Sequence, residues 1–178
     1  MSGSATCLAR PRGMQMHARR LAIEILTQVE EQQAYASLLL DAKLKQSRLS
    51  QQERALATEL TYGVLRWQGR LDYLLAAVTN RPWDTVDPAL RRLLRLGAYQ
   101  ILFLTRIPAY AAVNETVALT QEVVHSRIKP VAKAFINAIL RRLLERHGTI
   151  RFPDASSDPI GALATRWSHP PWLVARWL

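Results

Sequence analysis

The chain has 178 residues, and 24 lysines and arginines against 14 acidic residues give it a formal net charge of +10. Apolar residues make up 49% of the sequence, which supports a packed core and excludes a disordered chain. The single cysteine, Cys7, excludes an intrachain disulfide and a zinc site built from several cysteines. The charge favours a polyanionic partner such as nucleic acid. The sequence has no apolar run of the roughly 18 residues that a transmembrane helix needs, so we expect a cytoplasmic protein with no membrane partner.

Three regions differ in composition along the chain. Residues 1–15 carry Gly, Ser, Pro and two arginines without an apolar period, and we expect a flexible basic tail. Apolar residues recur at helical spacing through 16–148, and no stretch alternates as a strand does, so the predicted fold class is all-α. Residues 149–178 begin as a linker rich in Pro, Ser and Asp and continue as two short helical segments.

Start and stop signals divide the central region into seven helices. Ser50 and Glu53 form a capping box at the start of the third helix. Asp87 followed by Pro88 starts the fifth helix, which is apolar over most of its circumference and therefore expected at the centre of the bundle. The predicted ranges are about 16–32, 35–46, 51–67, 70–79, 88–104, 110–125 and 130–147, followed by 159–167 and 170–178 in the extension.

The residue patterns of common catalytic sites are absent. The seven glycines are scattered singly, and the four histidines do not have the spacing of metal ligands. Cys7 lies in the expected tail without a neighbouring base. We therefore predict no catalytic, cofactor-binding or metal-binding residue in this chain.

Arginine clusters are the stronger functional signal. Arg10, Arg12, Arg19 and Arg20 give the first twenty residues four positive charges and no negative one. Guanidinium groups bind phosphates bidentately and remain charged, so this cluster indicates a nucleic-acid contact. The alternative is a solvated tail and helix end. Arg141 and Arg142 also have a simpler explanation, as charges that complement the end of the seventh helix.

Several segments resemble a known family. LLRLGAYQILFLTRIPAYAAVNETVALTQ (93–121) and KAFINAILRRL (133–143) resemble the NusB fold, an all-α RNA-binding module of transcription antitermination factors. ARRLAIEILTQV (18–29) resembles the arginine-bearing first helix of that family. The resemblance covers roughly 17–147 and implies a NusB-like helical bundle that binds RNA.

Other segments resemble one branch of the family. ELTYGVLRWQGRLDYLL (59–75), TRIPAYAAVNETV (105–117), FINAILRR (135–142) and SHPPWLVARWL (168–178) resemble the N-terminal region of the ribosomal RNA small-subunit methyltransferase B family. That family methylates carbon 5 of a cytosine in small-subunit ribosomal RNA with S-adenosylmethionine. Its glycine-rich cofactor loop and catalytic cysteines have no counterpart in this sequence. The resemblance therefore implies a non-catalytic fragment, whose residues 149–178 lead to a methyltransferase domain that the chain lacks.

The resemblance also implies which residues bind RNA. Arg19 matches a position of the first helix that contacts RNA, and Phe135 matches an aromatic position that either stacks on a base or packs in the core. Lys129 and Lys133 are expected to flank Phe135, and Asn114 and Asn137 to tie helices together through buried hydrogen bonds. The predicted RNA-binding residues are Arg19, Arg20, Arg66, Arg106, Lys129, Lys133, Phe135 and Arg141, with Arg91 and Arg92 as further candidates.

Two alternatives remain open on the sequence alone. In the first, the chain is a free-standing antitermination-type RNA-binding protein whose partner is a ribosomal protein. In the second, it is a helical domain that mainly docks onto its own catalytic domain. If the first helix binds RNA, Arg19→Ala combined with Arg20→Ala is expected to weaken binding and to leave the helices folded.

Overall fold

The computed structural model describes residues 12–124 and 129–178, with side chains from Ala18 onward. These residues form nine α-helices, one short 3-10 helix and no strand, which confirms the all-α prediction. None of the described helices combines the length and apolar character needed to cross a bilayer. The elements are α1 (Arg12–Gln32), α2 (Ala36–Gln46), α3 (Gln51–Arg66), α4 (Gln68–Val78), η1 (Trp83–Thr85), α5 (Pro88–Phe103), α6 (Ala109–Val123), α7 (Lys129–Arg146), α8 (Pro159–Trp167) and α9 (Pro171–Trp177).

The predicted helix starts are confirmed at two caps. The Ser50 hydroxyl accepts a hydrogen bond from the Glu53 backbone N–H at 3.3 Å, and the Glu53 carboxylate accepts from the Ser50 backbone N–H at 3.0 Å. Asp87 Oδ1 accepts from the backbone N–H of Ala89 at 2.8 Å. The start of α1 differs, because the helix already includes residues 12–15, which the sequence assigned to the tail. Cys7 and Arg10 lie outside the described residues.

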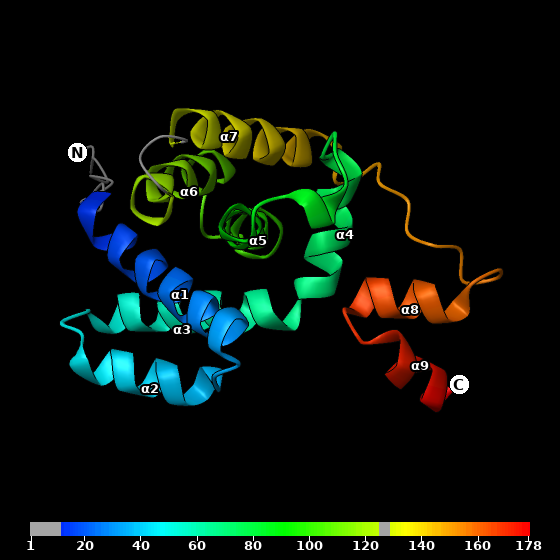
Figure 1. The fold of residues 1–178 in the computed structure, drawn as a ribbon, viewed down its shortest axis with the longest axis horizontal. Coiled ribbons are helices and arrows are strands. Elements are labelled where there is room, and N and C mark those ends of the chain that lie inside the picture. The colour runs from blue at the N-terminus through cyan, green and yellow to red at the C-terminus, as the bar shows by residue number, and fades with distance from the viewer. Residues whose placement is uncertain (1–11, 125–128) are drawn as a thin grey trace, which may run out of the picture.

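Helix α5 lies at the centre of the bundle and packs against α1, α3, α4, α6 and α7 (Figure 1). Its Leu93, Leu94 and Leu96 side chains are fully buried. Two glycines allow close helix crossings: a Cβ on Gly63 would lie 2.1 Å from the Tyr99 ring, and one on Gly97 would lie 2.6 Å from Leu140 Cδ1. Glycine is therefore required where α3 and α7 cross α5.

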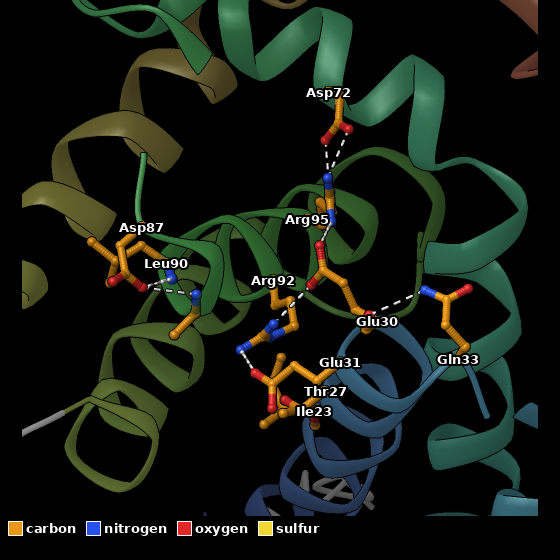
Figure 2. Close-up of polar contacts among 11 residues, drawn as sticks. Ile23, Thr27, Glu30, Glu31, Gln33, Asp72, Asp87, Leu90, Arg92 and Arg95 are labelled. Carbon is orange, nitrogen blue, oxygen red and sulfur yellow. Dashed lines mark hydrogen bonds and ion pairs between the residues drawn. The ribbon is translucent and has the colours of Figure 1, made fainter. Parts of the chain in front are cut away.

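A half-buried ion network joins α1, α4 and α5 (Figure 2). The Arg95 guanidinium donates two hydrogen bonds to the Asp72 carboxylate, at 2.7 and 2.8 Å. The Arg92 guanidinium donates to Glu30 at 2.8 Å and to Glu31 at 2.9 Å, and Glu30 also lies 3.4 Å from Arg95. Burial opposes ionisation of Glu30, but hydrogen bonds and charge from both arginines outweigh it and lower the Glu30 pKa.

The C-terminal extension packs on α4 instead of leaving the bundle as a free linker. The Tyr73 hydroxyl donates to the Arg151 carbonyl at 2.7 Å, and the Tyr73 ring stacks on Phe152. The backbone N–H of Gly69 donates to the Ser168 hydroxyl at 2.8 Å. Helix α8 packs against α4, and α9 packs against α8. The expected irregular segment is present between α7 and α8, but both of its flanks are anchored.

Candidate nucleic-acid interface

Helix α7 carries its predicted RNA-binding residues on two separate sides. Lys129, Lys133, Asn137 and Arg141 follow each other at four-residue spacing and form one row, in which the Arg141 guanidinium donates to Asn137 Oδ1 at 3.1 Å. Phe135 lies two residues from Lys133, and residues two apart on a helix do not face each other. The lysines therefore do not flank the ring, contrary to the sequence-based expectation.

The lysine row is positively charged and accessible. Lys129 and Lys133 are partly exposed and Arg141 is exposed. Within the described ranges none of these three side chains forms an ion pair with a carboxylate. Lys129 and Lys133 lie about one helical turn apart, and Arg141 lies about two turns further along. Such a row of uncompensated cations is a chemically suitable contact for phosphates.

Phe135 lies in a cleft on the other side of α7. The ring packs partly against the hydrophobic core, and the Arg81 guanidinium carbon lies 4.4 Å from its centroid. The Arg142 guanidinium donates to the Val78 carbonyl at 2.9 Å and to Asn80 Oδ1 at 2.6 Å, which fixes the end of α4 against α7. The cleft has a volume of about 730 Å³, and its lining includes Asn80, Arg81, Asp87, Val131, Phe135 and Arg142.

This cleft combines groups that recognise unpaired bases. An aromatic ring and a planar guanidinium both offer a face for stacking, and the two arginines add positive charge. Sequence reasoning missed Arg81 and Asn80, because they follow α4 and reach Phe135 only through the fold. The segment Asn80–Pro82 indicates the end of a helix, and nothing in its sequence points to the ring.

Arg19 lies in the interior. Its side chain is fully buried, and its Nε donates to Gln100 Oε1 on α5 at 2.6 Å. Burial lowers the Arg19 pKa, and the nearby Glu115 carboxylate partly offsets this effect. The structure therefore gives Arg19 a role in joining α1 to α5. Its predicted contact with RNA stays a prediction and would require α1 to move away from α5.

Arg20 lies on the surface of α1. Its side chain is more than half exposed and forms ion pairs with Glu24 at 3.2 Å and with Glu122 on α6 at 3.3 Å. Exposed pairs of this kind are worth at most about 1 kcal/mol, so a phosphate can compete for the guanidinium. Of the two adjacent arginines, Arg20 is the one placed to contact a polyanion.

The remaining candidates have different environments. Arg66 at the end of α3 and Arg106 after α5 are exposed, and Arg91 is partly buried. Arg92 is buried in the ion network of Figure 2, so its charge is already compensated and it is a structural residue. The expectation for Asn114 is wrong, because this side chain is exposed on α6.

Comparison with known proteins agrees with this architecture. Residues 16–145 match the model of the NusB family. The structure of T. maritima NusB superimposes with a TM-score of 0.65 over 78% of this chain and 93% of that chain, at 19% sequence identity. This identity is low, so the likeness concerns the fold.

Curated relatives are more similar in sequence. A protein of Bacillus subtilis named probable ribosomal RNA small subunit methyltransferase B is 42% identical to this chain over 159 residues. The ribosomal RNA small subunit methyltransferase B of Pseudomonas putida is 37% identical over 158 residues. Each match covers 89% of this chain and 34% of the relative, so the chain spans about a third of the length of these relatives. Because the family model matches most of the residues and the fold agrees, the chain belongs to the NusB family.

Proposed function

We propose that this chain is the RNA-binding domain of a methyltransferase that modifies carbon 5 of a cytosine in small-subunit ribosomal RNA. The domain holds the RNA, and the methyl transfer takes place in a catalytic domain outside this chain. The similarity to relatives named ribosomal RNA small subunit methyltransferase B, over 89% of the chain, supports this proposal. The α7 surface is the single structural observation that carries it.

The two sides of α7 suit the two parts of an RNA strand. A helix with its side chains is about 10–12 Å across, so one strand lying over α7 reaches both sides. On one side Lys129, Lys133 and Arg141 contact phosphates. On the other side the Phe135 ring and the Arg81 guanidinium receive unpaired bases. Phosphate contacts supply affinity, and stacking selects single-stranded over paired RNA.

The described residues do not fit S-adenosylmethionine. A cofactor cradle of the usual kind needs glycines at a strand-to-helix turn, where the backbone approaches the ligand. Gly63 and Gly97 instead lie at helix crossings, where the Tyr99 ring and Leu140 fill the space beside them. We therefore assign the cofactor to the catalytic domain.

The lysine row is tested by RNA affinity as a function of salt. Lys133→Ala removes one proposed phosphate contact, so the slope of log K against log salt for a small-subunit rRNA fragment should become shallower by about 0.7. Lys45→Ala on α2 is the matched control, since Lys45 is 74% exposed and pairs only locally with Asp41. Equal slopes for the two variants would remove the lysine row from the interface.

The cleft is tested by its ring. Phe135→Leu keeps an apolar side chain against the core but removes the stacking face, and affinity for single-stranded rRNA should fall about 5- to 150-fold, the equivalent of about 1–3 kcal/mol. Phe152→Leu is the control, because that ring stacks on Tyr73 beside α4. Unchanged affinity in Phe135→Leu would assign Phe135 to core packing.

The length of the open reading frame distinguishes this proposal from the alternative of a free-standing antitermination-type protein. The proposal requires a reading frame that continues past Leu178 into a methyltransferase domain. A frame that stops there would favour the antitermination alternative, with a ribosomal protein as partner.

A further inference from the structure

The C-terminal helices α8 and α9 expose four large apolar residues, Trp167, Trp172, Trp177 and Leu178, here together called the tryptophan surface. Their exposed fractions are 54, 67, 64 and 72%. Tryptophan is normally well buried, so three exposed tryptophans within eleven residues are unusual for a free surface. Apolar patches of this kind mark sites where another macromolecule binds.

The α8 end of the tryptophan surface is anchored on the bundle. Ser168 adopts a left-handed backbone conformation with φ 58°, and its hydroxyl accepts hydrogen bonds from the backbone N–H groups of Gly69 and Arg70. The Trp167 ring lies against Trp67, which stacks on Phe103 with centroids 4.9 Å apart. Contacts with α4 therefore order α8, and packing on α8 orders α9, so a partner bears less of the ordering cost.

Two exposed arginines indicate the kind of partner that fits the tryptophan surface. Arg166 and Arg176 lie at the tryptophan surface and are exposed, and neither forms an ion pair in the described parts of the chain. A complementary surface would place apolar side chains against the tryptophans and carboxylates against the two arginines.

We propose that the tryptophan surface docks the polypeptide that follows position 178 in the longer methyltransferase relatives, through an apolar patch edged with acidic side chains. This inference rests on the proposed function. The matched relatives are about three times as long as the match, because it covers 34% of them. A segment joined directly to α9 has a high effective concentration at this surface. RNA is the less suitable occupant, because α8 and α9 lie apart from α7, on another side of the bundle (Figure 1).

The test compares the 178-residue chain with the full-length product of its gene by hydroxyl-radical footprinting and mass spectrometry. Oxidation of Trp172 and Trp177 should fall several-fold in the full-length protein. Tyr35, just before α2, and Tyr110 on α6, which are 77 and 70% exposed, are internal controls whose oxidation should not change. Equal oxidation of the tryptophans in both proteins would overturn the proposal.

Other occupants give other protection patterns. If Trp172 and Trp177 become protected in the 178-residue chain as its concentration rises, the occupant is a second copy. If they become protected only when rRNA is added, the occupant is RNA. Either result would overturn the proposal.

A substitution in the full-length protein provides a second readout. Trp172→Ala combined with Trp177→Ala removes exposed side chains and should increase protease cleavage near position 178, with rRNA affinity retained. Leu38→Ala, at a side chain 68% exposed on α2, is the control. Unchanged cleavage in the double variant would contradict docking. The two proposals can fail separately. If the full-length protein methylates rRNA but its tryptophans are oxidised as in the 178-residue chain, docking alone is refuted. If the full-length protein has no methyltransferase activity, the proposed function is refuted.

Discussion

Adjacent arginines on one helix have different roles in this protein. Consecutive residues on an α-helix point about 100° apart, so Arg19 faces α5 while Arg20 faces solvent. The sequence shows two basic residues at the start of an apolar period, and it does not reveal which of them lies on the buried side. Arg19 is fully buried against Gln100, and Arg20 pairs with Glu24 and Glu122 on the surface.

The two arginines should differ in their effect on stability. Arg19→Ala leaves the buried Gln100 oxygen without its donor, so the free energy of unfolding should fall by about 1–3 kcal/mol. Arg20→Ala removes only exposed ion pairs and should change it by less than about 1 kcal/mol. Urea denaturation of the two single variants measures this difference.

The sequence-based expectation is that Arg19→Ala combined with Arg20→Ala leaves the helices folded. Because Arg19 is buried, this double variant is unsuitable as a test of binding. Arg20→Ala alone is the appropriate variant. Equal destabilisation by the two single substitutions would argue against the buried role of Arg19.

The candidate site was predictable to the extent that its residues share one helix. Lys133 and Phe135 stand out in the segment KAFINAILRR because their residue types and the family resemblance single them out. The contact of Phe135 with Arg81 was not predictable, because it joins α7 to the segment after α4. Sequence spacing also gives no measure of burial, which is why Arg92 was counted among the surface candidates.

At the scale of helices, local signals determine boundaries and glycines determine crossings. The capping box at Ser50 and the Asp87 cap lie where the sequence predicts them, since each needs only residues within three positions. The crossing of α3 over α5 depends instead on Gly63 meeting Tyr99, 36 positions further along the chain. A single glycine inside a helical pattern does not indicate its partner.

Filling this crossing should destabilise the fold. A methyl group on Gly63 would overlap the Tyr99 ring, so Gly63→Ala should lower the free energy of unfolding by about 1–3 kcal/mol. Gly148→Ala is the matched control, because a Cβ there meets nothing within 4 Å and the backbone φ is not positive. The control should be neutral or slightly stabilising in thermal denaturation. An equally harmless Gly63→Ala would show that α3 and α5 can separate without cost.

The ion network that joins α1, α4 and α5 should make stability depend on acid pH. The Glu30 pKa is lowered in the folded state, so its contribution is complete above the ordinary value of 4.5 and is lost as pH falls through the lower folded pKa. The free energy of unfolding should therefore decrease below about pH 4.5, and Glu30→Gln should flatten that decrease. Glu145→Gln, at an exposed position on α7, is the control. An unchanged acid profile in Glu30→Gln would contradict the role of the network.

For the whole molecule, the two proposed contact surfaces lie in different places. The RNA surface follows α7, and the tryptophan surface lies on α8 and α9 at another side of the bundle (Figure 1). Helix α4 connects them, because Arg142 holds its end against α7 and Gly69 near its start holds Ser168. Under the two proposals, one domain holds RNA on α7 and orients a neighbouring domain through α8 and α9.

The structure shows where part of the excess positive charge of +10 lies. Arg92 and Arg95 do not contribute to this excess, because they pair within the fold with the carboxylates of Glu30, Glu31 and Asp72. The row on α7 keeps its charge available. The central claim is therefore that electrostatic contacts along α7 bind RNA.

The most direct test of this claim is a salt titration of the wild-type 178-residue chain with small-subunit rRNA fragments. We expect log K to fall linearly with log salt, with a slope near −2 for three phosphate contacts to single-stranded RNA at about −0.7 each. Absence of binding at low salt, or affinity independent of salt, would contradict the account and favour a domain that only docks onto its catalytic partner.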